Sequence, residues 1–174
     1  MPFRPAVALI ALCLLGLPAS GALPEPVAST ALSPWTADVP PPLGLTDLAG
    51  VERDLHSMHG RTVVVHFFAT WCEPCIPELA ALERFRSRAG GEQLAVVAVG
   101  VGEGAVRLRR FFAGRPAAFT VLPDPDRRAT RAWRVEVLPA TFILDGDLKP
   151  RFAAEGDVDW DGLDPAALAA LVGP

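Results

Sequence analysis

The sequence predicts an α/β domain of three layers, with helices on both faces of a central mixed β-sheet. Runs of β-branched and aromatic residues alternate with segments of helical periodicity along the middle of the chain, which is typical of strands covered by helices. A predicted hairpin near the C-terminus adds antiparallel pairing to this alternation. The chain has 174 residues, of which 51% are hydrophobic, so we expect one domain with a sizeable core.

The first half of the domain contains a predicted hairpin, a buried strand and a long helix. Residues 45–55 are interpreted as a hairpin that turns at Ala49-Gly50. Residues 61–69 form an uninterrupted β-branched and aromatic run, which is typical of a strand covered on both faces. Residues 72–88 carry apolar side chains three and four positions apart, and this spacing predicts a helix that ends before Gly90-Gly91.

The second half continues the alternation and closes with a hairpin and a helix. The predicted elements are a strand over 94–101, a helix over 104–113, a strand over 119–122, a helix over 126–133, hairpin strands over 140–144 and 151–154, and a helix from Asp164-Pro165. Asp124 or Asp126 is expected to cap the helix over 126–133. The predicted order is therefore ββαβαβαββα.

The domain is predicted over residues 43–174, after a targeting segment and a linker. Residues 1–22 have the order of a secretory signal, because Arg4 precedes an apolar stretch and small residues precede a cleavage point after Ala22. The apolar stretch is shorter than the ~20 residues that span a bilayer. An uncleaved N-terminal anchor is the alternative. Six prolines in residues 23–42 predict an extended linker.

Composition restricts the classes of partner. The net charge of −4 argues against a nucleic-acid partner, because binding of phosphates needs a positive field. Several arginines on or just after the predicted helix over 104–113 are interpreted as a solvated surface, with an acidic docking partner as the alternative. They are Arg107, Arg109, Arg110 and Arg115. No cofactor is implied, and we expect a monomer.

Cys72 and Cys75 stand where the predicted strand over 61–69 gives way to a helix. Because a helix N-terminus favours a thiolate, the pair is predicted to be a redox dithiol, with Cys72 as the exposed nucleophile and Cys75 as the buried resolving thiol. The third cysteine, Cys13, is interpreted as a small apolar residue of the signal. A zinc site needs four ligands, and the sequence has no second pair of suitable spacing, so no metal site is predicted.

The two residues between the cysteines are predicted to tune the dithiol. Glu73 places a carboxylate beside the nucleophile and opposes formation of the thiolate. A less stable thiolate gives a lower reduction potential, so the Glu73-Pro74 pair favours a reductase over an oxidase. A solvated Glu73 with little effect is the alternative.

Four segments resemble the thioredoxin-like fold and, within it, the TlpA/ResA group of exported thiol–disulfide oxidoreductases. They are residues 67–75, 97–103, 137–142 and 156–160. The similarity extends over residues 43–172. It implies that Pro139 is a cis-proline packed against the dithiol, and it assigns substrate binding to Trp71 and Leu138.

Two ionisable residues have competing interpretations. The resemblance implies that Glu103 accepts a proton near the thiols, and a carboxylate placed at a helix N-terminus is the alternative. His66 stands six residues before Cys72, where thioredoxins carry a buried aspartate, and is interpreted either as a proton shuttle for Cys75 or as a core histidine.

The predicted function is reduction of a disulfide-bearing protein substrate in the periplasm, at the membrane if the N-terminal segment is retained. Cys72 would attack the substrate disulfide and Cys75 would release the product. The resemblance implies a membrane thiol donor of the DsbD or CcdA type and clients from cytochrome c biogenesis or copper-centre assembly. The alternatives are a thiol peroxidase of the same superfamily and a metal or haem chaperone that uses the two cysteines as ligands.

Overall fold

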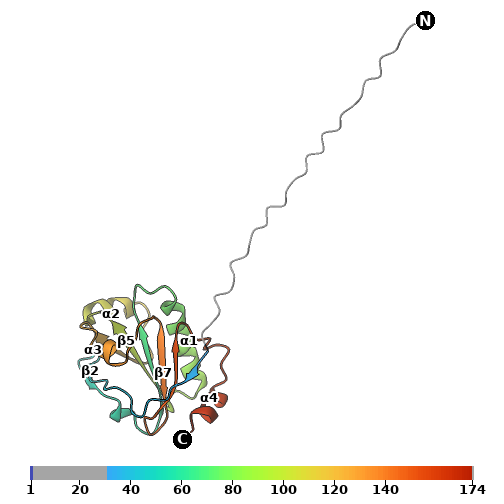
Figure 1. The fold of residues 1–174 in the computed structure, drawn as a ribbon. Helices are drawn as coiled ribbons and strands as arrows, with labels where there is room; N and C mark the ends of the chain where they lie inside the picture. Colours follow the sequence, from blue (N-terminus) through green and yellow to red (C-terminus); the bar gives the residue numbers. More distant parts are fainter. Residues whose placement is uncertain (2–30, 174) are drawn as a thin grey trace.

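A six-stranded mixed sheet forms the centre of the molecule (Figure 1). The computed structural model describes Met1 and residues 31–173. In spatial order, the strands are β1 (Ser33–Pro34), β8 (Pro150–Glu155), β7 (Ala140–Leu144), β4 (Thr62–Phe68), β5 (Leu94–Val101) and β6 (Thr120–Asp124). β4, β5 and β6 run parallel, whereas β7 is antiparallel to both β4 and β8, and β1 is antiparallel to β8. The predicted mixed sheet is confirmed.

Helices cover both faces of this sheet, as the sequence predicts. The covering elements are α1 (Cys75–Arg88), α2 (Ala105–Phe112), α3 (Arg128–Ala132), α4 (Pro165–Val172), the 3₁₀ helix η1 (His56–Met58) and the hairpin of β2 (Leu45–Thr46) with β3 (Glu52–Arg53). Buried side chains of α1, α2 and α4 pack on one face of the sheet. Those of α3, η1 and the hairpin belong to the core cluster on the other face.

Successive side chains of β4 point to opposite faces of the sheet, and one of them, a histidine, lies under α1. The odd-numbered residues 63–67 join the core cluster that contains α3. Val64 and Phe68 point the other way, and Phe68 shares a cluster with Cys75 of α1. His66 lies between Val64 and Phe68 on this face and is fully buried. The strand register therefore sets His66 beneath the first turns of α1.

The domain begins earlier than the predicted residue 43. β1 pairs with β8 at the sheet edge, and the backbone N–H of Trp35 donates to a carbonyl of β8 at 2.9 Å. The rings of Trp35 and Trp133 lie 5.7 Å apart. Residues 33–35 thus belong to the domain rather than to a linker over 23–42, because packing of the large indole stabilises this edge.

α1 begins at Cys75, three residues later than predicted. The N–H of Cys72 donates to the carbonyl of Ala69, and the N–H of Cys75 to the carbonyl of Cys72, so the dithiol segment forms turns before the helix. Pro74 is the N-cap and has no N–H to donate. Pro77 falls in the first turn, where backbone N–H groups have no partner within the helix, and it therefore does not interrupt α1.

Other boundaries agree closely with the sequence. β5 matches the predicted strand over 94–101, whereas α3 is shorter than the predicted helix over 126–133. The carboxylate of Asp124, one of the two predicted caps, accepts the N–H groups of Ala129 and Thr130 at the start of α3. Asp164 caps α4 through the N–H of Ala166.

The predicted signal over residues 1–22 falls, apart from Met1, outside the described residues, as does the linker before Ala31. Within the described part of the chain, no helix has the length and apolar character needed to cross a membrane.

Candidate active site around Cys72 and Cys75

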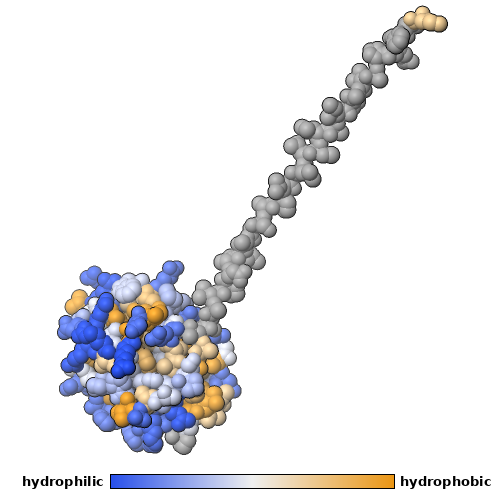
Figure 2. All heavy atoms as spheres, in the orientation of Figure 1, coloured by the Kyte–Doolittle hydropathy of each residue, from blue (hydrophilic) through white to orange (hydrophobic). Residues whose placement is uncertain are grey.

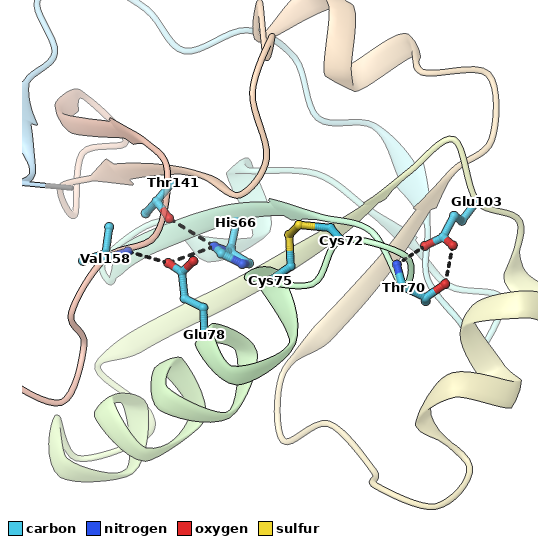
Figure 3. The surroundings of a disulfide bond; sticks show 8 residues. All are labelled: His66, Thr70, Cys72, Cys75, Glu78, Glu103, Thr141 and Val158. Carbon is cyan, nitrogen blue, oxygen red and sulfur yellow. Dashed lines mark hydrogen bonds and ion pairs between the residues drawn. A yellow bond between two sulfur atoms is a disulfide. The ribbon is translucent and has the colours of Figure 1, made fainter. Parts of the chain in front are cut away.

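Cys72 and Cys75 form a disulfide at the junction of β4 and α1 (Figure 3). Their Cα atoms are 5.4 Å apart. Cys75, the first residue of α1, is fully buried, whereas Cys72 in the preceding turn keeps 6% of its surface exposed. The predicted exposure of Cys72 is therefore wrong, since both sulfurs are largely covered; Cys72 is only the more accessible of the two.

Cys72 borders a cleft of about 430 Å³. Residues 71–74 line it together with Arg127, Glu136 and Leu138, and Trp71 at its rim is 60% exposed. A larger cavity of about 520 Å³ lies elsewhere and contains no cysteine. The cleft beside Cys72 is therefore the candidate site for a substrate, and the predicted tuning residues Glu73 and Pro74 belong to its wall.

The loop that precedes β7 forms another part of the cleft. The Leu138–Pro139 peptide bond is cis, as the resemblance implies. Leu138 lines the cleft with Cys72, and the carbonyl of Pro139 accepts the N–H of Gly156 at 2.8 Å. The structure thus brings this loop to the dithiol, although residues 72 and 139 are far apart in the sequence.

Glu103 is buried on the side of the disulfide opposite His66 (Figure 3). One carboxylate oxygen accepts the N–H of Thr70 at 2.9 Å. The other accepts the Thr70 hydroxyl at 2.5 Å and lies 2.6 Å from Nε of Arg107. Because both oxygens are engaged, these contacts tie Glu103 to Thr70, two residues before Cys72.

His66 lies between the carboxylate of Glu78 and the disulfide in Figure 3. Its Nδ1 is 3.1 Å from the hydroxyl oxygen of Thr141 and 3.9 Å from Oε1 of Glu78. Its Nε2 has no hydrogen-bond partner among the described residues. Complete burial lowers the pKa of His66 from 6.5 to about 4, so the imidazole is neutral at physiological pH.

Glu78, which the sequence reasoning missed, is the second buried carboxyl group near the dithiol. Its Oε1 accepts the indole N–H of Trp160 at 2.9 Å and the N–H of Val158 at 3.2 Å, while Oε2 has no partner within residues 31–173. Burial raises the pKa of Glu78 to about 7. The available signal was its position, three residues after Cys75 and therefore on the same helix face.

His66 and Glu78 lie close enough to form an ion pair. Their pKa values, however, leave both side chains uncharged over a wide pH range. Below about pH 7, Glu78 holds its proton, and above about pH 4 His66 has lost its own. Over this interval Glu78 is therefore the protonated member of the pair and His66 the neutral one. A buried carboxylic acid that titrates near neutrality can exchange a proton with the neighbouring chemistry.

A metal site would need several His, Cys, Asp or Glu side chains to converge on one point. Over residues 31–173, no group of three or more His, Cys, Asp and Glu side chains is arranged to hold a metal ion. His56 and His59 are exposed, at and just after η1.

Comparisons with known proteins give the family. The AhpC/TSA family matches residues 37–151. The thiol-disulfide oxidoreductase ResA of Bacillus subtilis is 31% identical over 105 residues, which are 60% of this chain and 59% of ResA. The Geobacillus kaustophilus ResA is 31% identical over 111 residues, covering 63% of this chain and 64% of that protein. The chain thus spans about 60% of the length of these curated relatives.

Solved structures share the fold. A Chlorobium tepidum protein assigned as the thiol:disulfide interchange protein DsbE has a TM-score of 0.70 and 28% identity, covering 81% of this chain and 99% of its own. StoA from Bacillus subtilis has a TM-score of 0.61 at 17% identity, covering 72% of this chain and 95% of its own, and supports the fold alone. The fold is thioredoxin-like, as the sequence resemblance implies.

Proposed function

We propose that this chain, which belongs to the AhpC/TSA family, is a thiol–disulfide oxidoreductase that reduces disulfides in proteins. The observation that carries the proposal is the asymmetry of the two sulfurs: Cys72 borders an open cleft, whereas Cys75 is sealed beneath it. The ResA relatives are named as thiol-disulfide oxidoreductases, which supports the same reaction class.

In the proposed reaction, the reduced protein presents Cys72 as a thiolate. This sulfur attacks one sulfur of the substrate disulfide and expels the other as a thiolate, leaving a mixed disulfide. Cys75 then loses its proton, attacks the Cys72 sulfur and expels the second substrate thiol. The substrate gains two electrons and two protons, and the protein ends with the Cys72–Cys75 disulfide.

Glu78 and His66 are the proposed acceptors of the Cys75 proton. Glu78 lies one turn after Cys75, and its pKa of about 7 suits a general base at neutral pH. His66 lies between Glu78 and the sulfurs. In the tautomer whose Nδ1–H donates to Thr141, its Nε2 keeps a free lone pair that can accept the Cys75 proton.

Glu103 is proposed to position the dithiol turn. Its two oxygens are engaged by Thr70 and Arg107, and Thr70 lies two residues before Cys72. The proton-acceptor role implied by the resemblance stays a prediction, and substitution of Glu103 separates the two interpretations.

Leu138, Pro139 and Trp71 are proposed to hold an extended substrate segment in the cleft. Proline at position 139 has no backbone N–H, so the backbone groups of Leu138 are the ones available for pairing with the substrate. Trp71 offers a large exposed ring at the rim, where an apolar side chain of the substrate can pack.

Glu73 between the cysteines supports the reductive direction, because a neighbouring negative charge disfavours the thiolate. A reductase in an oxidising compartment needs electrons, so we propose a membrane thiol donor of the DsbD or CcdA type. The signal-like residues 1–22 support export to the periplasm. Apocytochrome c before haem attachment and copper-centre assembly proteins are the proposed clients.

A Cys75→Ser variant tests the function in the native cell. Without the resolving thiol, a mixed disulfide should accumulate on Cys72, and mass spectrometry of the trapped adduct would identify the client. Cys72→Ser is the control and should trap nothing. If Cys72 of the Cys75→Ser variant stays reduced with no adduct, the exchange mechanism is wrong. A reduction potential of about −120 mV, the value of a strong oxidant, would contradict the reductase direction.

A further inference from the structure

Positive charge is concentrated in one stretch of this acidic chain. Residues 105–134 contain eight arginines and two aspartates and carry a net charge of +6, whereas the whole chain carries −4. All eight arginines are exposed, and we call them the arginine face: Arg107, Arg109, Arg110, Arg115, Arg127, Arg128, Arg131 and Arg134. Figure 2 shows strongly hydrophilic side chains over the side of the molecule where Figure 1 places α2 and α3.

Few carboxylates of the protein itself neutralise the arginine face. Among the described residues, only Arg107 of this set lies within ion-pair distance of a carboxylate, that of Glu103. Three others donate to backbone carbonyls, which leave the charge in place: Arg109, Arg128 and Arg131. Of the two aspartates, Asp124 is buried and accepts hydrogen bonds from α3. The face therefore presents a positive field to solvent.

This face reaches the dithiol from two sides. Nε of Arg107 donates to the hydroxyl of Thr70 at 2.9 Å, two residues before Cys72. Arg127 lines the cleft into which Cys72 opens. α2 follows β5 and α3 follows β6, so both helices start at the carboxyl end of the parallel strands, where β4 delivers the dithiol, although they cover opposite faces of the sheet.

Arg127 lines the cleft next to a glycine, Gly102. Arg127 has a left-handed φ of 52°, which is uncommon for a residue other than glycine. Gly102 also has a positive φ, and a Cβ there would lie 3.0 Å from Nε of Arg127. Glycine at position 102 therefore leaves room for the Arg127 side chain in the wall of the cleft that Cys72 borders.

We propose that the arginine face docks acidic residues of the polypeptide whose disulfide Cys72 attacks. This inference rests on the proposed function and names the chemistry of the client. A molecule that covers this face while Cys72 reacts must also bring a disulfide into the cleft, which favours a polypeptide over a lipid surface. Glu73 and Glu136 at the cleft repel acids next to the substrate cysteine, so the acidic residues of the client lie farther out, opposite α2 and α3.

Two synthetic disulfide peptides test this without any variant. One carries several glutamates outside its disulfide loop, and the other carries lysines at the same places. Stopped-flow measurement of their reaction with the reduced protein should give a second-order rate about tenfold higher for the glutamate peptide at low ionic strength. The difference should vanish at about 1 M salt, where charges are screened within about 3 Å.

Charge reversals locate the effect on the face. Arg110→Glu on α2 and Arg131→Glu on α3 should each lower the rate with the glutamate peptide by about threefold at low salt. Both variants should react unchanged with hydroxyethyl disulfide, which is small and uncharged. Lys149→Glu is the matched control, because it reverses one exposed charge in the turn after β7, at the opposite end of the sheet.

The outcomes separate this inference from the proposed function. Equal rates for both peptides, or a faster lysine peptide, overturn the docking inference and leave the reductase intact. Binding to phosphatidylglycerol vesicles that is lost in Arg110→Glu, with peptide rates unchanged, assigns the face to a membrane and also overturns it. If the reduced protein reacts with neither peptide nor with hydroxyethyl disulfide, the proposed function itself fails.

Discussion

Two buried carboxyl groups lie near the dithiol, and their partners differ in kind. Glu103 is 3% exposed and Glu78 is 4% exposed, so depth does not distinguish them. Glu103 has both oxygens occupied and an arginine against one of them. Glu78 has two uncharged donors on one oxygen and, in the described structure, none on the other. A cation favours the carboxylate, whereas burial without a cation favours the acid.

The comparison teaches that the partners of a buried carboxyl group, rather than its depth, distinguish a structural role from a role in proton exchange. Glu103 is placed to hold the turn before Cys72, and Glu78 to serve the chemistry of Cys75. The same substitution, glutamate to glutamine, can be made at both positions. The assignment predicts that the two variants differ in their effects.

The largest expected effect is on the pH dependence of stability after removal of His66. The pKa of Glu78 is raised to about 7 in the fold, so its contribution to stability falls as pH rises from about 4.5 to 7. The pKa of His66 is lowered to about 4, so its contribution rises between about pH 4 and 6.5. In the wild type these trends oppose each other.

A His66→Asn variant keeps only the falling trend. Relative to the wild type, its free energy of unfolding should drop by about 3 kcal/mol between pH 4 and 7. Urea unfolding of the oxidised proteins across this range measures the difference. Parallel stability curves for the two proteins would show that His66 and Glu78 do not titrate as assigned.

Glu78→Gln should slow the resolving step about 100-fold at pH 7, because the proposed general base is lost. The measurement is release of a peptide from a mixed disulfide prepared on Cys72. In the wild type this rate should rise with pH through about 7, as Glu78 loses its proton. The variant should lose that rise. Glu83→Gln on the same helix is the matched control and should leave the profile unchanged.

Glu103→Gln should act on stability instead. Loss of the charged partner of Thr70 and Arg107 is expected to lower the free energy of unfolding by about 2 kcal/mol. The rise of the resolving rate through pH 7 should remain. If Glu103→Gln abolishes that rise while Glu78→Gln does not, the proton-acceptor role implied by the resemblance is correct and the assignment to Glu78 is wrong.

Elements with a strong local pattern could be predicted from the sequence. β5 agrees with its predicted range because an uninterrupted apolar run leaves few alternatives to a buried strand. β1 was missed because it has two residues in a proline-rich segment, and its identity depends on pairing with β8, more than a hundred residues away. The start of α1 depends on the turn closed by the hydrogen bond from the N–H of Cys72 to the carbonyl of Ala69. The spacing of apolar residues does not reveal such a turn.

The site divides in the same way. The dithiol follows from its motif and the cis-proline loop from the family resemblance, but Glu78 looks like any acidic residue on a solvated helix face. Its burial comes from Trp160 and Val158, about eighty residues downstream, whose contacts only the fold creates. His66 could be placed under the dithiol from its spacing, whereas its partners Thr141 and Glu78 could not be foreseen.

The smallest expected effect concerns a third carboxylate, the exposed Glu73 beside Cys72. Water screens its charge, unlike that of Glu103, so Glu73→Gln should raise the reduction potential of the dithiol by only about 15 mV. Equilibration with glutathione buffers, read out by thiol labelling, measures this shift. Glu136→Gln, which changes an exposed carboxylate elsewhere along the cleft, is the matched control. An unchanged or lower potential in Glu73→Gln would mean that Glu73 is a solvated charge without influence on the thiolate, and the reductive bias would then have to come from the buried groups under Cys75.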